Sequence, residues 1–261
     1  MHRIGVFDSG IGGLTVLRRL REAFPQLDMV YLGDTARVPY GGRSVETITH
    51  YAEDDVRFLL RKDVEAIVIA CGTVSSNSLD TLRESFDLPI YGVIESAAEL
   101  AARVTRTRSV GVIGTQATVK SGAYEARIRA SAPDVCVISR ACPLFVPLVE
   151  NGIAPGDIVA ETVCSRYMEA FDGEDIDTLI MGCTHYPVYR PALEKRLPGV
   201  RMIDVGEALA EALRPLFAEN AGSGATEYYV TERSAAFDEI VRVMDAALDP
   251  AAICVENAFI Q

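Results

Sequence analysis

Two kinds of hydrophobic pattern alternate along the chain. Short apolar runs typical of β-strands are followed by longer stretches in which apolar residues recur at the spacing of an α-helix. The run at residues 66–70 is apolar at every position, which suits a strand buried on both faces. This alternation predicts an α/β fold with mainly parallel sheets and flanking helices. Strands are expected over residues 3–8, 29–33, 66–71, 109–114, 135–141, 178–182, 227–231 and 253–256, and helices over residues 12–24, 44–61, 75–86 and 235–248.

An internal repeat divides this pattern into two halves. The segment 4–10 resembles 110–116, since each is a strand that ends in a small, hydroxyl-bearing turn and then opens a helix. The segment 68–73 resembles 180–185, since each is a buried strand that ends in a cysteine with a threonine close behind it. We therefore expect two pseudo-symmetric α/β domains, the second beginning near residue 98.

The matched cysteines, Cys71 and Cys183, define the candidate chemistry. Ligands of open α/β sheets bind beyond the carboxyl ends of the strands, where both cysteines are expected to lie. If the two halves face each other, the thiols converge on one interdomain cleft from opposite sides. One thiolate could then remove a proton from one face of a carbon while the other thiol returns a proton to the opposite face.

Composition and charge exclude several other classes of protein. The 261 residues carry a net charge of −12 with a sequence pI near 4.8 and no basic stripe, which argues against a nucleic-acid partner. No apolar run is long enough to span a bilayer, so we expect no membrane partner. The N-terminus has no signal-peptide pattern, and cytoplasmic localisation is the expectation.

The remaining cysteines are predicted to be structural. None of the six cysteines forms a CxxC pair, and disulfides are uncommon in a reducing compartment. The sequence predicts that the four outside the repeat are small buried hydrophobes. These residues are Cys136, Cys142, Cys164 and Cys254.

Motifs for bound cofactors are weak. The glycine turn at 8–13 lacks the third glycine of a dinucleotide fingerprint, and no second ligand pair accompanies Cys183 and His185 to make a zinc site. The three lysines are poorly placed to form a Schiff base with pyridoxal phosphate. A hydrolase that uses Cys183 as nucleophile and His185 as base remains an alternative, although it leaves Cys71 without a role.

Five motifs in order resemble the glutamate racemase family, within the wider aspartate/glutamate racemase group. They cover almost the whole chain and comprise residues 7–13, 33–41, the strand end at Cys71, 114–118 and 182–187. The resemblance implies an isomerase that needs no cofactor and no metal and that converts L-glutamate to D-glutamate for peptidoglycan. It also implies a homodimer and a C-terminal segment that returns to the first domain, giving domains of 1–97 plus 206–261 and 98–205.

The resemblance also assigns roles to individual residues. Cys71 and Cys183 would carry the proton on the D face and the L face respectively. Assistance to the two thiols is expected from Asp8, Asp34, Glu150 and His185. Substrate contacts are expected from Asp8, Ser9, Pro39, Tyr40, Gly41, Gly72, Thr73, Thr115, Thr118, Thr184 and His185.

One position departs from the family pattern, which usually has asparagine where this chain has Gly72. Either the backbone there needs a positive φ, or the site has lost an amide donor. We favour the lost donor, which predicts that Gly72→Asn lowers KM and that Gly72→Ala is nearly silent. Affinity and substrate choice stay open at this point: aspartate is an alternative substrate, and a non-catalytic amino-acid-binding protein is an alternative function.

Overall fold

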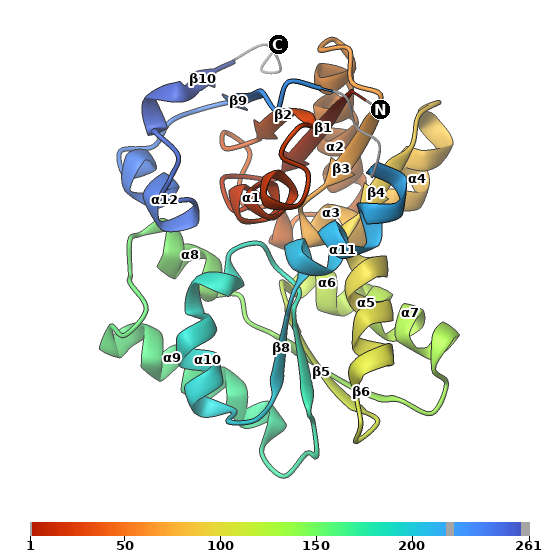
Figure 1. Ribbon diagram of the computed structural model, residues 1–261. Helices are drawn as coiled ribbons and strands as arrows, with labels where there is room; N and C mark the ends of the chain where they lie inside the picture. Colours follow the sequence, from red (N-terminus) through yellow and green to blue (C-terminus); the bar gives the residue numbers. More distant parts are fainter. Residues whose placement is uncertain (1, 218–221, 257–261) are drawn as a thin grey trace.

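Two parallel β-sheets organise the chain in the computed structural model, which describes residues 2–217 and 222–256 (Figure 1). The first sheet has the strand order β10-β9-β2-β1-β3-β4, and the second has the order β6-β5-β7-β8. Every pair of neighbouring strands in these sheets is parallel. The strands of the first sheet are β1 (Arg3–Asp8), β2 (Asp28–Gly33), β3 (Ala66–Ile69), β4 (Ile90–Gly92), β9 (Thr226–Val230) and β10 (Ile253–Val255). Those of the second are β5 (Ser109–Gly114), β6 (Cys136–Ala141), β7 (Thr178–Met181) and β8 (Arg201–Asp204).

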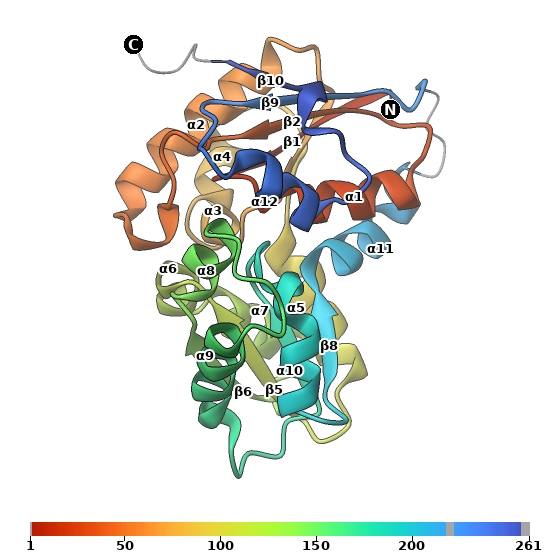
Figure 2. The same cartoon turned by 90° about the vertical axis from the view of Figure 1, so that its left-hand side faces the viewer.

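The helices cover the sheets and connect their strands. Helices α1 to α4 belong with the first sheet, and helices α6 to α10 belong with the second (Figures 1 and 2). Helices α5 and α11 pack against each other where the chain passes between the sheets. The bounds are α1 (Leu14–Ala23), α2 (Val45–Leu60), α3 (Gly72–Asn77), α4 (Leu79–Ser85), α5 (Val93–Val104), α6 (Gln116–Ser121), α7 (Ala123–Ser131), α8 (Phe145–Glu150), α9 (Ile158–Met168), α10 (Arg190–Arg196), α11 (Val205–Phe217) and α12 (Phe237–Met244).

The central strands β1, β2 and β3 of the first sheet are buried on both faces, as the apolar runs predict. In β1, Ile4 and Val6 join the core beneath α1 and α5, whereas Phe7 points to the opposite core beneath α2. Helix α2 shows how such a helix is specified locally. The hydroxyl of Ser44 accepts a hydrogen bond from the backbone N–H of Thr47 at the start of the helix. Its apolar residues then recur at helical spacing along the buried face: Ile48, Ala52, Val56 and Leu59.

The two sheets repeat one topology. The order β2-β1-β3-β4 in the first sheet corresponds to β6-β5-β7-β8 in the second. A cysteine follows the third strand of each set, Cys71 after β3 and Cys183 after β7. The prediction of two pseudo-symmetric parallel sheets with flanking helices is therefore confirmed, and β9 and β10 return to the first sheet beside β2.

Some local expectations are wrong. The single helix expected over residues 75–86 is two helices, because Ser78 adopts a non-helical backbone and bonds Thr49 through its hydroxyl. The short strands β4 and β8 were not predicted. Cys136 and Cys254 are exposed and not buried, because each lies on an edge strand, β6 and β10 respectively.

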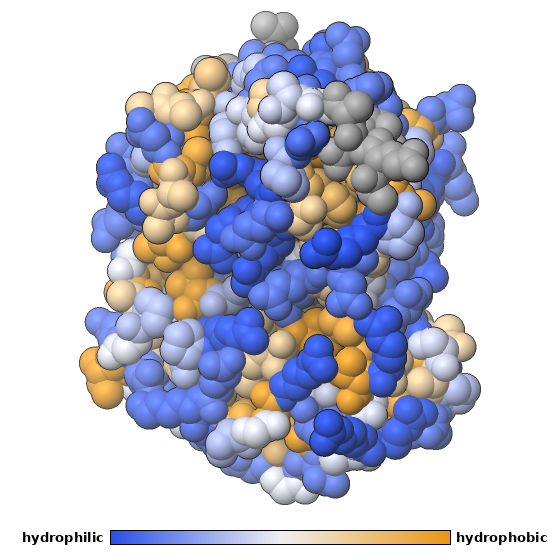
Figure 3. Space-filling view, viewed as in Figure 1, coloured by the Kyte–Doolittle hydropathy of each residue, from blue (hydrophilic) through white to orange (hydrophobic). Residues whose placement is uncertain are grey.

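The surface is mostly hydrophilic, with apolar residues gathered between the two halves around α8 (Figure 3). Leu144, just before α8, is 51% exposed. Across residues 2–217 and 222–256, no helix combines the length and apolar character needed to cross a membrane.

Candidate active site

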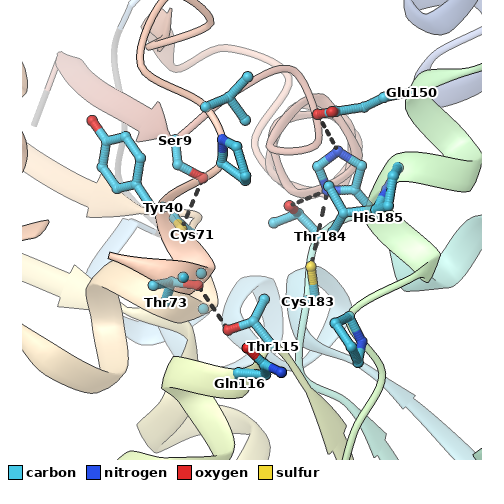
Figure 4. Close-up of a pocket in the computed structure, with 18 residues that line it drawn as sticks. Ser9, Tyr40, Cys71, Thr73, Thr115, Gln116, Glu150, Cys183, Thr184 and His185 are labelled. Atoms are coloured by element: carbon cyan, nitrogen blue, oxygen red, sulfur yellow. Dashed lines mark hydrogen bonds and ion pairs between the residues drawn. The ribbon is translucent and has the colours of Figure 1, made fainter. Parts of the chain in front are cut away.

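A cavity of about 350 Å³ lies between the carboxyl ends of the two sheets. Cys71 and Cys183 lie on opposite sides of it (Figure 4). The lining residues come from both halves: Ser9, Val38, Pro39, Tyr40, Gly41, Gly42, Cys71, Gly72, Thr73, Thr115, Gln116, Pro143, Val146, Pro147, Glu150, Cys183, Thr184 and His185. The structure thus brings together all the residues predicted for the site except Asp8, Asp34 and Thr118, which lie behind the cavity wall.

Cys71 is buried at the start of α3. Its sulfur is 3.2 Å from the hydroxyl oxygen of Ser9, and the thiol donates to that oxygen. Burial raises the pKa of the Cys71 thiol to about 12, and the nearby Asp8 carboxylate adds to this effect. Cys71 is therefore a protonated thiol at neutral pH and can serve as a proton donor.

Cys183 has an imidazole as its neighbour. Its sulfur lies 3.9 Å from Nδ1 of His185, and Nε2 of His185 is 3.2 Å from Oε1 of Glu150. Burial opposes the charged imidazolium, but the hydrogen bonds to Cys183 and Glu150 outweigh it and raise the pKa of His185 to about 10. A protonated His185 can donate a hydrogen bond to a thiolate at Cys183.

Aromatic packing fixes the helix that carries Glu150. The ring of Phe145 lies 5.0–5.3 Å from the rings of Tyr167, Tyr186 and Tyr189. The Tyr186 hydroxyl donates to the carbonyl of Cys142. These contacts hold α8 against α9 and against the turn Tyr186–Tyr189 that follows β7, so Glu150 reaches His185 from a rigid support.

Asp8 supports the cleft from behind. It is fully buried, and burial raises the pKa of its carboxyl group. Its Oδ2 accepts from the N–H of Gly10 at 3.0 Å, and its Oδ1 accepts from the Thr184 hydroxyl at 3.3 Å. Asp8 therefore ties the glycine turn of the first half to the residue after Cys183.

Threonine hydroxyls bridge the floor of the cleft. The hydroxyl oxygens of Thr73 and Thr115 are 3.0 Å apart, across the boundary between the two halves. Thr115 also caps α6 by accepting from the N–H of Thr118 at 3.2 Å, and the hydroxyl oxygens of these two residues are 3.0 Å apart. Thr118 thus acts on the cavity through Thr115.

Asp34 lies on the far side of Tyr40 from the cavity. Tyr40 lines the cleft, while its hydroxyl points away from it and donates to Asp34 (Figure 4). Arg37 bonds Asp34 at 2.5 Å and Asp55 at 3.3 Å. Burial, followed by repulsion from Asp34, raises the pKa of Asp55. This buried cluster holds the wall at residues 38–42.

The structure rules out one of the two explanations for Gly72. Its φ is not positive, and it is the first residue of α3. A Cβ at this position would lie 2.4 Å from the carbonyl oxygen of Gly182, so a side chain here requires the backbone to shift. This contact argues against a nearly silent Gly72→Ala, for a steric reason that the sequence does not contain.

Several lining residues were missed by the sequence analysis. Val38, Pro143, Val146 and Pro147 form an apolar part of the wall, and Gln116 lies at the start of α6. Val38 lies within the motif 33–41 and Gln116 within the motif 114–118, so the neighbouring site residues in each motif could have indicated them. The segment 143–147 is too short to show a periodic pattern.

The lining combines two thiols with hydroxyl groups, one imidazole and one carboxylate. No lysine or arginine is among the lining residues, so a charged substrate would rely on hydroxyl and backbone donors. The described part of the chain holds no group of three or more His, Cys, Asp or Glu residues arranged for a metal ion. Two thiols with different partners on opposite walls can act as an acid and a base on one bound molecule.

The fold and the site define a two-sheet α/β protein with a pair of opposed cysteines in its central cleft. A family model described as Asp/Glu/Hydantoin racemase matches residues 4–213. The chain belongs to this family, which places it among the amino-acid racemases, a class of isomerases, and confirms the family that its motifs predict.

Individual relatives align over almost the whole chain. The glutamate racemase of Aquifex aeolicus is 47% identical over 242 residues, covering 93% of each protein. The structure of glutamate racemase from Thermus thermophilus in complex with beta-chloro-D-alanine has 43% identity and a TM-score of 0.83, covering 97% of this chain and 95% of that one. The structure of glutamate racemase from Francisella tularensis in complex with D-glutamate has 35% identity and a TM-score of 0.88, and the match covers 98% of this chain and 96% of that one.

Proposed function

We propose that this protein interconverts L- and D-glutamate by a two-base mechanism in which Cys71 and Cys183 carry the proton. The observation that supports this most directly is the position of the two thiols on opposite sides of one cavity, each with its own hydrogen-bonding partner. A protein that only binds an amino acid needs no such pair. A cysteine–histidine hydrolase would leave Cys71 unused.

The proposed L-to-D reaction begins with a thiolate at Cys183, paired with protonated His185. The thiolate takes the α-proton of L-glutamate, and the electrons of the broken C–H bond remain on the α-carbon. Cys71 then gives its thiol proton to the opposite face, which forms the new C–H bond and leaves a thiolate at Cys71. The D-to-L direction runs through the same steps in reverse, so each turnover leaves the enzyme in the opposite protonation state.

Glutamate is the proposed substrate because each of the three relatives described above is a glutamate racemase with 35–47% identity. The Francisella enzyme is described in complex with D-glutamate. Aspartate remains the alternative substrate, and a direct comparison of the two amino acids distinguishes them.

The cellular role follows from this substrate. We propose that the product D-glutamate supplies peptidoglycan synthesis in the cytoplasm. We propose two domains, residues 1–97 plus 206–261 and residues 98–205.

We propose that the protein works as a homodimer. The exposed side chains of Leu144, Ile158 and Val159 support a self-association surface near α8 and α9. Sedimentation of the purified protein tests the oligomeric state.

Deuterium incorporation tests the reaction. Reduced protein without added cofactor is incubated in heavy water with L-glutamate, D-glutamate, L-aspartate or D-aspartate, and deuterium at the α-carbon and optical rotation are followed. We expect inversion and exchange with both glutamate enantiomers, unchanged by a chelator. Absence of exchange with either glutamate enantiomer would refute the proposal, and faster turnover of aspartate would change the substrate.

A further inference from the structure

The backbones of the two halves touch beside the two cysteines. The Cβ position of Gly72 is 2.4 Å from the carbonyl oxygen of Gly182, at least 0.6 Å short of the 3.0 Å below which real Cβ contacts essentially never occur. Gly72 directly follows Cys71, and Gly182 directly precedes Cys183. We propose that this glycine-to-glycine contact sets the distance between the two thiols, and this role rests on the proposed two-base reaction.

Neither side of the contact can recede easily. The N–H of Gly182 donates to the carbonyl of Ile113 at 2.8 Å, and the ring of Tyr124 lies 2.8 Å from the Cβ position of Gly182. In the first half, the carbonyl of Cys71 accepts from the N–H of Ser75 at 2.9 Å within the first turn of α3. Because the neighbouring atom is a backbone oxygen, a rotamer change cannot relieve a clash. We therefore expect an added Cβ to move the two halves apart.

A second contact between the halves could accommodate an added side chain more easily. The Cβ position of Gly12 meets the Thr184 hydroxyl at 2.4 Å and the His185 ring at 2.5 Å. These are side-chain atoms that can rotate. Of these two contacts, the one at Gly72 transmits a change in spacing directly to the backbone next to Cys183.

The spacing matters because both sulfurs must reach one carbon. Proton transfer requires reacting atoms about 3–3.5 Å apart, and a misplacement of about 1 Å can lower the rate about 100-fold. A separation of about 0.6 Å is expected to reduce turnover about 10- to 100-fold. The added separation moves one sulfur too far from the α-carbon to transfer a proton, while the other sulfur still contacts the substrate.

A larger distance between the two thiols should have a kinetic effect that a loss of substrate binding does not have. When the distant thiol is slow to deliver a proton, the carbanion is reprotonated more often by the thiol that formed it. The proton that this thiol took from the substrate exchanges with heavy water before it is returned, so deuterium enters the starting enantiomer without inversion. The ratio of exchange to inversion should therefore rise.

The test compares Gly72→Ala with Gly5→Ala. Gly5 does not line the cleft, and the nearest atoms to its Cβ position are side-chain atoms of Leu59 at 2.8–3.2 Å, which can shift. We expect Gly72→Ala to lower kcat about 10- to 100-fold, with a smaller change in KM and an exchange-to-inversion ratio at least tenfold above that of the wild type. We expect Gly5→Ala to keep the exchange-to-inversion ratio of the wild type. Gly72→Asn should behave like Gly72→Ala despite its added donor.

Three results would overturn the inference. One is an unchanged exchange-to-inversion ratio in folded Gly72→Ala. Another is a lower KM in Gly72→Asn, which would restore the lost-donor interpretation. A third is a Gly72→Ala protein that does not fold by circular dichroism, which would make the contact structural and not a spacer. Failure of the wild type to racemise glutamate would instead refute the proposed function, so the two failures are distinguishable.

Discussion

The two walls of the cleft share a topology but differ in chemistry. Cys71 follows β3 and Cys183 follows β7, at equivalent places in the two sheets. Beside Cys71 the neighbour is a serine hydroxyl, and burial raises the thiol pKa to about 12. Beside Cys183 the neighbour is His185, whose pKa is raised to about 10 and which is backed by Glu150.

This difference shows how a symmetric scaffold can give two identical residues different surroundings. A duplicated sheet places the thiols on opposite walls, while the neighbouring side chains set the surroundings of each thiol. In the reaction that we propose, the Cys71 thiol donates a proton and a Cys183 thiolate accepts one when the substrate is L-glutamate. Each L-to-D turnover of that proposed reaction leaves the opposite state.

The largest expected effect comes from removing either thiol. Cys71→Ala and Cys183→Ala should each lower racemisation by at least about 10²–10⁴-fold, because each removes one acid–base group. The remaining thiol should still exchange the α-proton of one enantiomer. We expect Cys71→Ala to exchange deuterium into L-glutamate and Cys183→Ala to exchange it into D-glutamate. Proton NMR in heavy water measures the deuterium exchange in both variants. The reverse pattern would mean that Cys71 acts on the L face and Cys183 on the D face.

A smaller effect is expected when the imidazole is removed. His185→Asn should slow the L-to-D step in single turnovers about 10- to 100-fold, the value of one hydrogen bond to a charged group, and should slow the D-to-L step less. kcat/KM must stay equal in both directions, since the equilibrium constant between enantiomers is one.

The pH dependence of this effect has a defined sign. Because the pKa of His185 is raised to about 10, the imidazolium persists from neutral pH up to that value and is lost as the pH rises through it. The difference between wild type and His185→Asn should therefore shrink above about pH 10. Equal slowing of both directions at every pH would leave His185 with a positioning role.

The sequence predicted the scaffold well because strand pattern and repeat are local signals. It located Cys71, Cys183 and His185, since each follows a buried strand that parallel pairing brings to one edge. It could not tell on which side of Tyr40 the Asp34 carboxylate lies, because that depends on packing against Arg37 and α2. The strands β4 and β8, three and four residues long, are too short to give a periodic signal.

The contact between Gly72 and Gly182 was also beyond the reach of the sequence. It joins residues 110 positions apart, and only the distance between the assembled sheets makes a side chain at Gly72 clash with Gly182. From the sequence alone, the absence of a side chain at Gly72 looks like the loss of a hydrogen-bond donor. The structure shows instead that a side chain there would lack space.

The smallest expected effects concern the four cysteines outside the cleft. Cys136 and Cys254 are exposed on the edge strands, whereas Cys142 and Cys164 are buried. Cys136→Ser and Cys254→Ser should change the free energy of unfolding by no more than about 0.5 kcal/mol, since surface substitutions rarely do more. Cys142→Ala and Cys164→Ala should cost about 1–2 kcal/mol through lost packing, without loss of racemisation.

A variant that combines all four substitutions would carry thiols only at Cys71 and Cys183. Denaturant unfolding of the single variants measures the stability changes, and the combined variant should be less stable by about the sum of the two buried losses, because distant sites are nearly additive. If it stays folded and active, every thiol titration or alkylation signal reports on Cys71 and Cys183 alone, and the protonation of these two thiols can be measured directly. Loss of activity with the fold retained would mean that a third cysteine takes part, and the comparison between two walls would no longer describe the site.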